Sequence, residues 1–226
     1  MQGTLVNAAA IIAGALLGTL FGVYLPEKIR VTVMQGIGLG TLLIGFQMAL
    51  GVENILLLLL SLVAGAITGE ICSIQERLNS WGKALEKRFS SPGNDLFTKG
   101  FVTTTLLFCV GAMAIVGPLE SGLTGEHSIL YAKSLIDGVA SIILSASFGV
   151  GVAFSALSVF LYQGSITLLA GWLNTYLTET VIAEVTATGG LLIVGIGLNI
   201  LEIKEIKVGN LLPALLYAFL LALLWG

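Results

Sequence analysis

The chain has 226 residues, of which 56% are hydrophobic and 10% are charged, and its mean hydropathy is +1.01. Soluble domains carry about 25% charged residues, so this composition excludes a soluble globular protein and predicts an integral membrane protein. The net charge is −3 and the ten basic residues are spread along the chain, which argues against a nucleic-acid partner. The two cysteines, Cys72 and Cys109, form no metal-binding spacing, and we expect no metal and no cofactor.

Eight apolar stretches are long enough to cross a bilayer, which requires about 20 residues per helix. The first basic residue, Lys28, follows the first stretch, so a cleaved signal peptide is not expected. The chain is therefore predicted to be an all-α, polytopic transmembrane bundle. Its predicted spans lie near residues 4–24, 33–51, 54–70, 100–118, 133–151, 155–176, 185–201 and 209–226.

The charged residues predict the orientation of the chain. The alternate loops 25–32, 71–99 and 202–208 hold nine of the ten basic residues. Lys133 is the only basic residue in the opposite set of loops. Because cytoplasmic loops are enriched in Lys and Arg, both termini are expected outside. That opposite set holds the acidic residues Glu53, Glu120, Glu126, Glu179 and Glu184.

The segment from Glu70 to Asp95, within the loop 71–99 and its margin, is the one sizeable polar stretch. Its apolar residues recur every three or four positions, which predicts an amphipathic cytoplasmic helix that lies on the lipid headgroups. Residues 90–94 then predict a surface turn. The apolar positions are Ile74, Leu78, Trp81, Leu85 and Phe89, and the turn is Ser90, Ser91, Pro92, Gly93 and Asn94.

Spans one to three resemble spans six to eight. A shift of 152 residues gives eight identities across positions 24–47, and four extra residues in the second copy then align Val52 and Asn54 with Val208 and Asn210. The second copy begins five spans after the first. Because five is an odd number, the second copy crosses the membrane in the opposite direction, and the repeat is predicted to be inverted. The aligned pairs include Tyr24 with Tyr176, Leu25 with Leu177, Glu27 with Glu179, Gly38 with Gly190, Gly45 with Gly197, and Gln47 with Asn199.

This repeat predicts a domain organisation. Residues 1–70 form the first three-span repeat, 71–99 the cytoplasmic helix and turn, 100–151 a central two-span unit, and 152–226 the second repeat. Inverted repeats are common in secondary transporters, whose sites lie near the bilayer midplane.

The second helix of each repeat is rich in glycine. Gly36 and Gly38 in one copy, and Gly189 and Gly190 in the other, predict helix breaks whose free backbone groups bind an ion. Close helix packing is the competing explanation. In the first span, the small-residue ridge of Gly14, Gly18 and Gly22 favours close packing outright.

A polar stripe marks the fifth span. Lys133 and Asp137 are one helical turn apart, and Ser141 and Ser145 continue the same face. A charge near the bilayer centre costs ~3 kcal/mol, so such residues usually face a bundle interior or a water-filled cavity. We expect Asp137 to bind a cation or proton, with Lys133 as its competitor; an anionic solute would instead use Lys133. A structural ion pair remains the alternative. The neutral ligands expected near the centre are Ser141, Ser145, Gln47 and Asn199.

Six segments of the chain form a distinctive set: 109–117, 122–125 with His127, 131–138, 162–169, 189–195 and 210–213. Together they resemble the bacterial YqgA/YdfK-like family, whose domain has no established function. The resemblance covers essentially the whole chain, and it implies a polytopic helical protein of the bacterial cytoplasmic membrane. It implies no substrate.

The expected function is secondary transport of an ion or small solute. An ion channel or pore is the first alternative, and a non-transporting membrane scaffold is the second. An enzyme is not expected, because the single histidine, His127, lies in an outer loop and no catalytic motif is present. The expected partners are the lipid bilayer, a small solute or ion, and a second copy in a homodimer.

Overall fold

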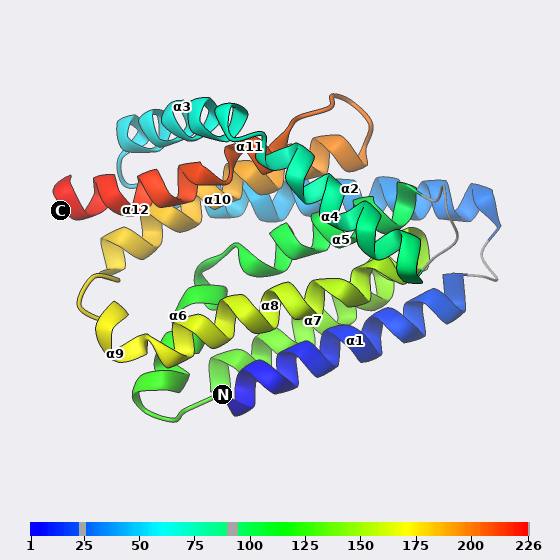
Figure 1. Cartoon of the computed structure of the whole chain (residues 1–226), viewed down its shortest axis with the longest axis horizontal. Coiled ribbons are helices and arrows are strands. Elements are labelled where there is room, and N and C mark those ends of the chain that lie inside the picture. Colours follow the sequence, from blue (N-terminus) through cyan, green and yellow to red (C-terminus); the bar gives the residue numbers. More distant parts are fainter. Residues whose placement is uncertain (23–25, 90–94, 226) are drawn as a thin grey trace. The chain divides into compact units, whose positions relative to one another are not determined.

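The structure, a computed structural model, describes residues 1–22, 26–89 and 95–225, and all regular structure in these ranges is helical (Figure 1). The helices of the first half are α1 (Gln2–Gly22), α2 (Glu27–Ala49), α3 (Ile55–Ile71), α4 (Ile74–Phe89), α5 (Asp95–Cys109) and α6 (Ala112–Leu123). Those of the second half are α7 (Ser128–Phe148), α8 (Gly151–Leu168), α9 (Ala170–Leu173), α10 (Glu179–Ile200), α11 (Val208–Leu211) and α12 (Pro213–Trp225).

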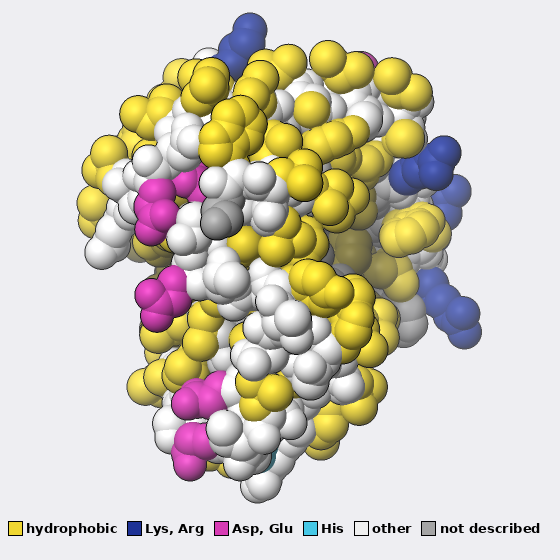
Figure 2. All heavy atoms as spheres, turned by 90° about the vertical axis from the view of Figure 1, so that its left-hand side faces the viewer, with side chains coloured by type: hydrophobic (Ala, Val, Ile, Leu, Met, Phe, Trp, Pro, Cys, Tyr) yellow, Lys and Arg dark blue, Asp and Glu magenta, His cyan; other side chains and the backbone are white. Residues whose placement is uncertain are grey.

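The predicted multi-pass helical architecture is confirmed. Among the described residues, six helices are long and apolar enough to cross a membrane, and the number rises to eight if each of two bent helix pairs is one span. The bent pairs are α3 with α4, at 58°, and α5 with α6, at 61°. Hydrophobic side chains also spread over much of the surface in view in Figure 2, as expected of a protein that contacts lipid. The inverted repeat and the outside termini stay predictions.

The fourth predicted span, 100–118, is not one continuous helix. Helix α5 ends at Cys109, and α6 begins at Ala112 in a different direction. Gly111 has a φ of +129°, a conformation that favours glycine. Hydropathy did not predict this break, because the residues on both sides of it are apolar.

Helix α4 covers most of the segment predicted as an amphipathic helix, and its cytoplasmic location stays a prediction. Some sequence features fall outside the described residues. They are the turn at 90–94, and Tyr24 and Leu25 of the repeat.

Packing divides the chain into two compact units. The first unit contains Met1–Met34, Asn79–Cys109 and Met113–Asn174, and the second contains Gln35–Leu78, Val110–Ala112 and Thr175–Gly226. This division follows contacts rather than sequence similarity, so the domain boundaries derived from the repeat stay a prediction.

In the first unit, α1 packs along α7 through its glycine ridge. A Cβ atom on Gly18 would collide with the carbonyl group of Ile142, and Gly14 and Gly22 meet the backbone of α7 in the same way. The close packing predicted for the first span is confirmed. Helix α8 packs against both α1 and α5.

In the second unit, α3 packs against α12, and both contact α10. Gly65 and Gly69 of α3 lie against the backbone of Ala214 and Asn210. An apolar core lies beside this contact and is formed by Leu57, Val181, Ala218 and Ala222. The tight approach of α3 and α12 depends on these small residues.

The predicted helix breaks at Gly36, Gly38, Gly189 and Gly190 are wrong. Helices α2 and α10 run without interruption through these positions. Gly38 packs against Leu201, Gly189 against Val110, and Gly190 against Ala49, whereas Gly36 faces open space. The glycines of α10 therefore serve close packing, which was the competing explanation.

Candidate functional site

Four polar side chains meet in the interior of the first unit. Lys133 and Asp137 come from α7, Asn7 from α1 and Gln163 from α8. We call these four residues the Asp137 cluster. Their relative exposures are 6% for Lys133, 3% for Asp137, and 0% for Asn7 and Gln163. The cluster is therefore enclosed by protein.

An ion pair and two amide hydrogen bonds connect the cluster. The Lys133 Nζ atom lies 3.0 Å from Asp137 Oδ2 and 3.1 Å from Oδ1. The Asn7 amide donates to Asp137 Oδ2 at 3.1 Å and to Gln163 Oε1 at 3.2 Å. The carboxylate accepts hydrogen bonds from one ammonium group and one amide group. These bonds compensate its negative charge and fix the orientation of the side chain.

Local sequence places each member of the cluster. Lys133 and Asp137 are four residues apart, so they share one face of α7. Asn7 precedes Gly14 by seven residues, or about two helical turns, and thus lies on the glycine-ridge face of α1 that packs against α7. The close approach of the two helices lets the short Asn7 side chain reach Asp137.

The cluster has unused hydrogen-bonding capacity. Among the described residues, Asn7 Oδ1 has no donor and Gln163 Nε2 has no acceptor. Thr4, one turn before Asn7, and Thr167, one turn after Gln163, also have unpartnered hydroxyl groups. An unsatisfied buried polar group costs about 1–3 kcal/mol, so a polar ligand that bonds these atoms would stabilise the site.

The two predicted serine ligands lie further along α7, and both are buried. The Ser145 hydroxyl donates to the Ser141 carbonyl oxygen at 2.6 Å. The Ser141 hydroxyl has no partner. Ser141 thus offers a neutral oxygen one turn from Asp137, as the sequence predicted for this face, and its role in binding stays a prediction.

The other two predicted ligands belong to the second unit. Gln47 is exposed. The Asn199 side chain donates to the Ile206 carbonyl oxygen at 2.8 Å and accepts from the Ile206 N–H at 2.7 Å. Asn199 therefore fixes the segment that follows α10, and a ligand role for either residue stays a prediction.

The charged pair also lies near the end of a broken helix. Cys109, the last residue of α5, is close enough to Lys133 and Asp137 to interact with both charges. Sequence reasoning placed the helix break elsewhere, at Gly36 and Gly189.

The site predicted from the sequence did not include Asn7 or Gln163. The only feature of the sequence that could have indicated these two residues is their polarity within apolar stretches. They lie 156 residues apart, so only the packing of the helices brings them together. Glu184 was placed in an outer loop, but it lies within α10 and is fully buried. An acidic residue near the end of an apolar stretch is easily mistaken for a loop residue.

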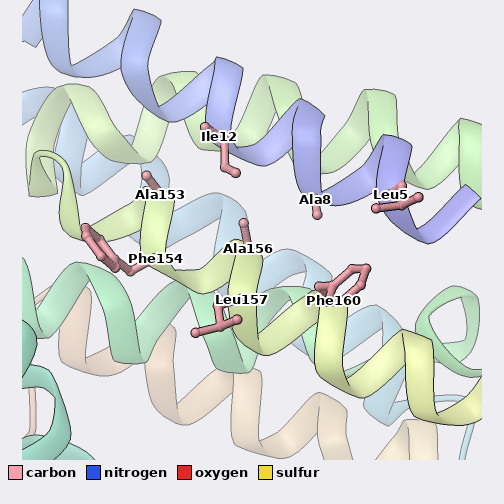
Figure 3. Close-up of a pocket in the computed structure, with 8 residues that line it drawn as sticks. All are labelled: Leu5, Ala8, Ile12, Ala153, Phe154, Ala156, Leu157 and Phe160. Atoms are coloured by element: carbon pink, nitrogen blue, oxygen red, sulfur yellow. The ribbon is translucent and has the colours of Figure 1, made fainter.

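A groove of about 570 Å³ between α1 and α8 is distinct from the cluster (Figure 3). It holds no polar side chain, so it does not suit an ion or a polar solute. The groove is lined by Leu5, Ala8, Ile12, Ala153, Phe154, Ala156, Leu157 and Phe160.

The apolar helices and the enclosed charged cluster define a multi-pass helical membrane protein. The chain belongs to the family described as "Protein of unknown function (DUF554)", whose sequence profile matches residues 2–223. This confirms the resemblance seen in the sequence.

Two relatives are similar over nearly their whole length. The uncharacterized membrane protein YdfK of Bacillus subtilis (strain 168) is 36% identical over 220 residues, which cover 96% of this chain and 93% of that protein. The uncharacterized protein YqgA of Escherichia coli (strain K12) is 33% identical over 227 residues, which cover 99% and 97%. No solved structure matches.

Proposed function

We propose that this protein is a small secondary transporter of an ion or small solute in the bacterial cytoplasmic membrane, and that the Asp137 cluster forms part of its binding site. One observation carries the proposal. A buried ion pair is surrounded by amide groups that still have a free donor and a free acceptor. A purely structural pair would gain little over apolar packing, because desolvation offsets most of its attraction.

The cluster offers a simple exchange mechanism. In the unloaded state, Lys133 neutralises Asp137. A transported cation or proton replaces Lys133 at the carboxylate, while Asn7 and Gln163 supply neutral hydrogen-bonding groups. Because ionisable groups within membranes commonly mark ion pathways, Asp137 is the proposed coupling residue. The four side chains of the cluster include no serine, cysteine or threonine nucleophile, so we favour transport over catalysis.

The packing of α2 against α10 supports the proposed inverted repeat. Gly45 packs against Val194, and Leu42 packs against Gly197. The repeat shift of 152 residues relates position 42 to 194 and position 45 to 197. Applied to both partners, the shift therefore turns the contact between 45 and 194 into the contact between 197 and 42. A two-fold axis at the helix crossing would produce this exchange, as in transporters built from inverted repeats.

A second pair of contacts obeys the same relation. Gly38 packs against Leu201, and Ala49 packs against Gly190. Adding 152 to 38 gives 190, and adding 152 to 49 gives 201. The proposed repeat therefore pairs spans one to three with spans six to eight. The distribution of Lys and Arg among the loops favours both termini outside.

Flux through purified protein in liposomes tests the proposal. The melting temperature is first measured in the presence of alkali cations, amino acids and organic acids. Each solute that raises it is then applied as a gradient across the liposome membrane, and coupled proton movement is measured with a pH-sensitive dye inside the liposomes. We expect Asp137→Asn to abolish coupled flux and the exposed-residue control Glu179→Gln to keep it.

Three results would contradict secondary transport. Normal coupled flux in folded Asp137→Asn would remove Asp137 from the mechanism. Turnover far above that of alternating access, without counterflow, would indicate a channel. If no solute stabilises the wild type and Asp137→Asn only lowers its melting temperature, the protein is a scaffold and the charged pair is structural.

A further inference from the structure

The second unit contains an isolated buried carboxylate. Glu184 has a relative exposure of 0%. Its Oε1 atom accepts hydrogen bonds from the backbone N–H groups of Glu53, at 3.1 Å, and Asn54, at 2.6 Å. Asn54 is the N-cap residue of α3, so Glu184 ties α10 to the start of α3.

The other oxygen of this carboxylate is unused. Glu184 Oε2 has no hydrogen-bond partner, and neither ion pair found among the described residues includes Glu184. A buried carboxylate that lacks a cation is strongly disfavoured, because it has lost the solvation of water. The two backbone amides bond to Oε1 and leave Oε2 unsatisfied.

Thr188 lies one turn further along α10 and is also fully buried. Threonines in this chain commonly bond back to the carbonyl oxygen four residues earlier, as Thr41 does to Ile37 and Thr104 to Gly100. Within the part of the chain that the structure describes, the Thr188 hydroxyl has no hydrogen-bond partner. Residues four apart lie on the same helix face, so α10 presents two unpartnered oxygens on one buried face.

We propose that Glu184 Oε2 and Thr188 Oγ1 are ligands of a monovalent alkali cation such as Na⁺. Carboxylate and hydroxyl oxygens are hard ligands suited to such ions, with backbone carbonyl groups or water completing the coordination. A single carboxylate balances a single positive charge. Among the described residues, no group of three His, Cys, Asp or Glu side chains could hold a metal ion, which disfavours a divalent or transition metal.

This site is separate from the Asp137 cluster, and its occupancy does not require that the protein transports anything. The ion would neutralise Glu184 while Oε1 keeps its bonds to α3. Cation binding is therefore expected to stabilise the attachment of α3 to α10.

Equilibrium binding and thermal unfolding of the full-length protein in detergent test the site. Radioactive Na⁺ binding is measured by scintillation proximity, and the melting temperature is recorded as NaCl or KCl replaces choline chloride at constant ionic strength. At a hundredfold excess of cation over its dissociation constant, the melting temperature is expected to rise by roughly 5–10 °C.

Matched variants assign the effect to the two oxygens. Glu184→Gln keeps an acceptor for the amides of residues 53 and 54 but loses the charge, and it is expected to abolish binding. Thr188→Val keeps the side-chain shape, and we expect binding at least about tenfold weaker. Glu179→Gln, an exposed change on the same helix, should bind as the wild type does.

Two outcomes would overturn the site. One is the absence of any Na⁺ or K⁺ response in folded wild-type protein, including a case in which stability follows pH alone. The other is an unchanged response in Thr188→Val, which also decides the question if Glu184→Gln does not fold. Loss of flux in Asp137→Asn with intact Na⁺ binding would leave this site in place, so the two proposals fail separately.

Discussion

Removing one member of the Lys133–Asp137 pair should destabilise the protein far more than removing both. The two side chains are 8% and 5% exposed, and their charged atoms lie 3.0 Å apart. Lys133→Met leaves the Asp137 charge with only the Asn7 amide, and Asp137→Leu leaves an unpaired ammonium. Breaking a buried pair in this way costs about 3–5 kcal/mol, whereas replacing both residues by apolar ones is often neutral.

These magnitudes correspond to measurable shifts. For a chain of this size, a loss of 3–5 kcal/mol lowers the melting temperature by roughly 6–20 °C. The double variant Lys133→Met/Asp137→Leu should melt within a few degrees of the wild type. The assay is thermal unfolding in detergent, followed by tryptophan fluorescence.

An exposed ion pair provides the control. Lys207 pairs with Glu70 at 2.7 Å, but both side chains are 60% exposed. Lys207→Met should therefore leave the melting temperature almost unchanged, since water and salt screen such pairs. If the two single effects at 133 and 137 simply add in the double variant, the residues do not act as a pair and the reasoning is refuted. A stable double variant without flux would assign the pair to transport.

Two further predictions concern packing and pH. Gly18→Ala should lower stability by about 1–3 kcal/mol, because the new methyl group meets the Ile142 carbonyl group. The methyl group of Gly36→Ala enters open space, so this variant should raise stability by up to about 1 kcal/mol. Equal melting temperatures of the two variants would contradict this reasoning. The pKa of Glu126 is lowered from its ordinary value near 4.5, chiefly by a hydrogen bond from the Ser128 hydroxyl. A lowered folded-state pKa gives stability that is present above the ordinary pKa and lost as pH falls through the folded value. Glu126→Gln should therefore flatten the dependence of the melting temperature on pH below about pH 4.5.

Some of the candidate site was predictable from local spacing. Lys133 and Asp137 pair because a helix places residues four apart on one face, and a charged face within an apolar helix must be buried or solvated. Asn7 and Gln163 could not be assigned in this way. They join Asp137 from helices 130 and 26 residues away along the chain, and only packing decides which polar residues meet.

The glycine residues show a different limit. Glycine permits both a helix break and a close helix crossing, so its position alone does not distinguish them. Gly190 lies in a continuous helix and packs against Ala49. Gly111 lies in the fourth span, where no break was predicted, and it has a positive φ at the point where the helix is broken.

The sequence by itself determined that this is a multi-pass helical membrane protein, because a bilayer requires long apolar stretches with internally satisfied backbone groups. It also determined the polar face of α7. Only the tertiary structure decided where the fourth span breaks, which amides surround Asp137, and that Glu184 is buried. These features depend on contacts between distant segments, and hydropathy and helical periodicity describe each segment alone.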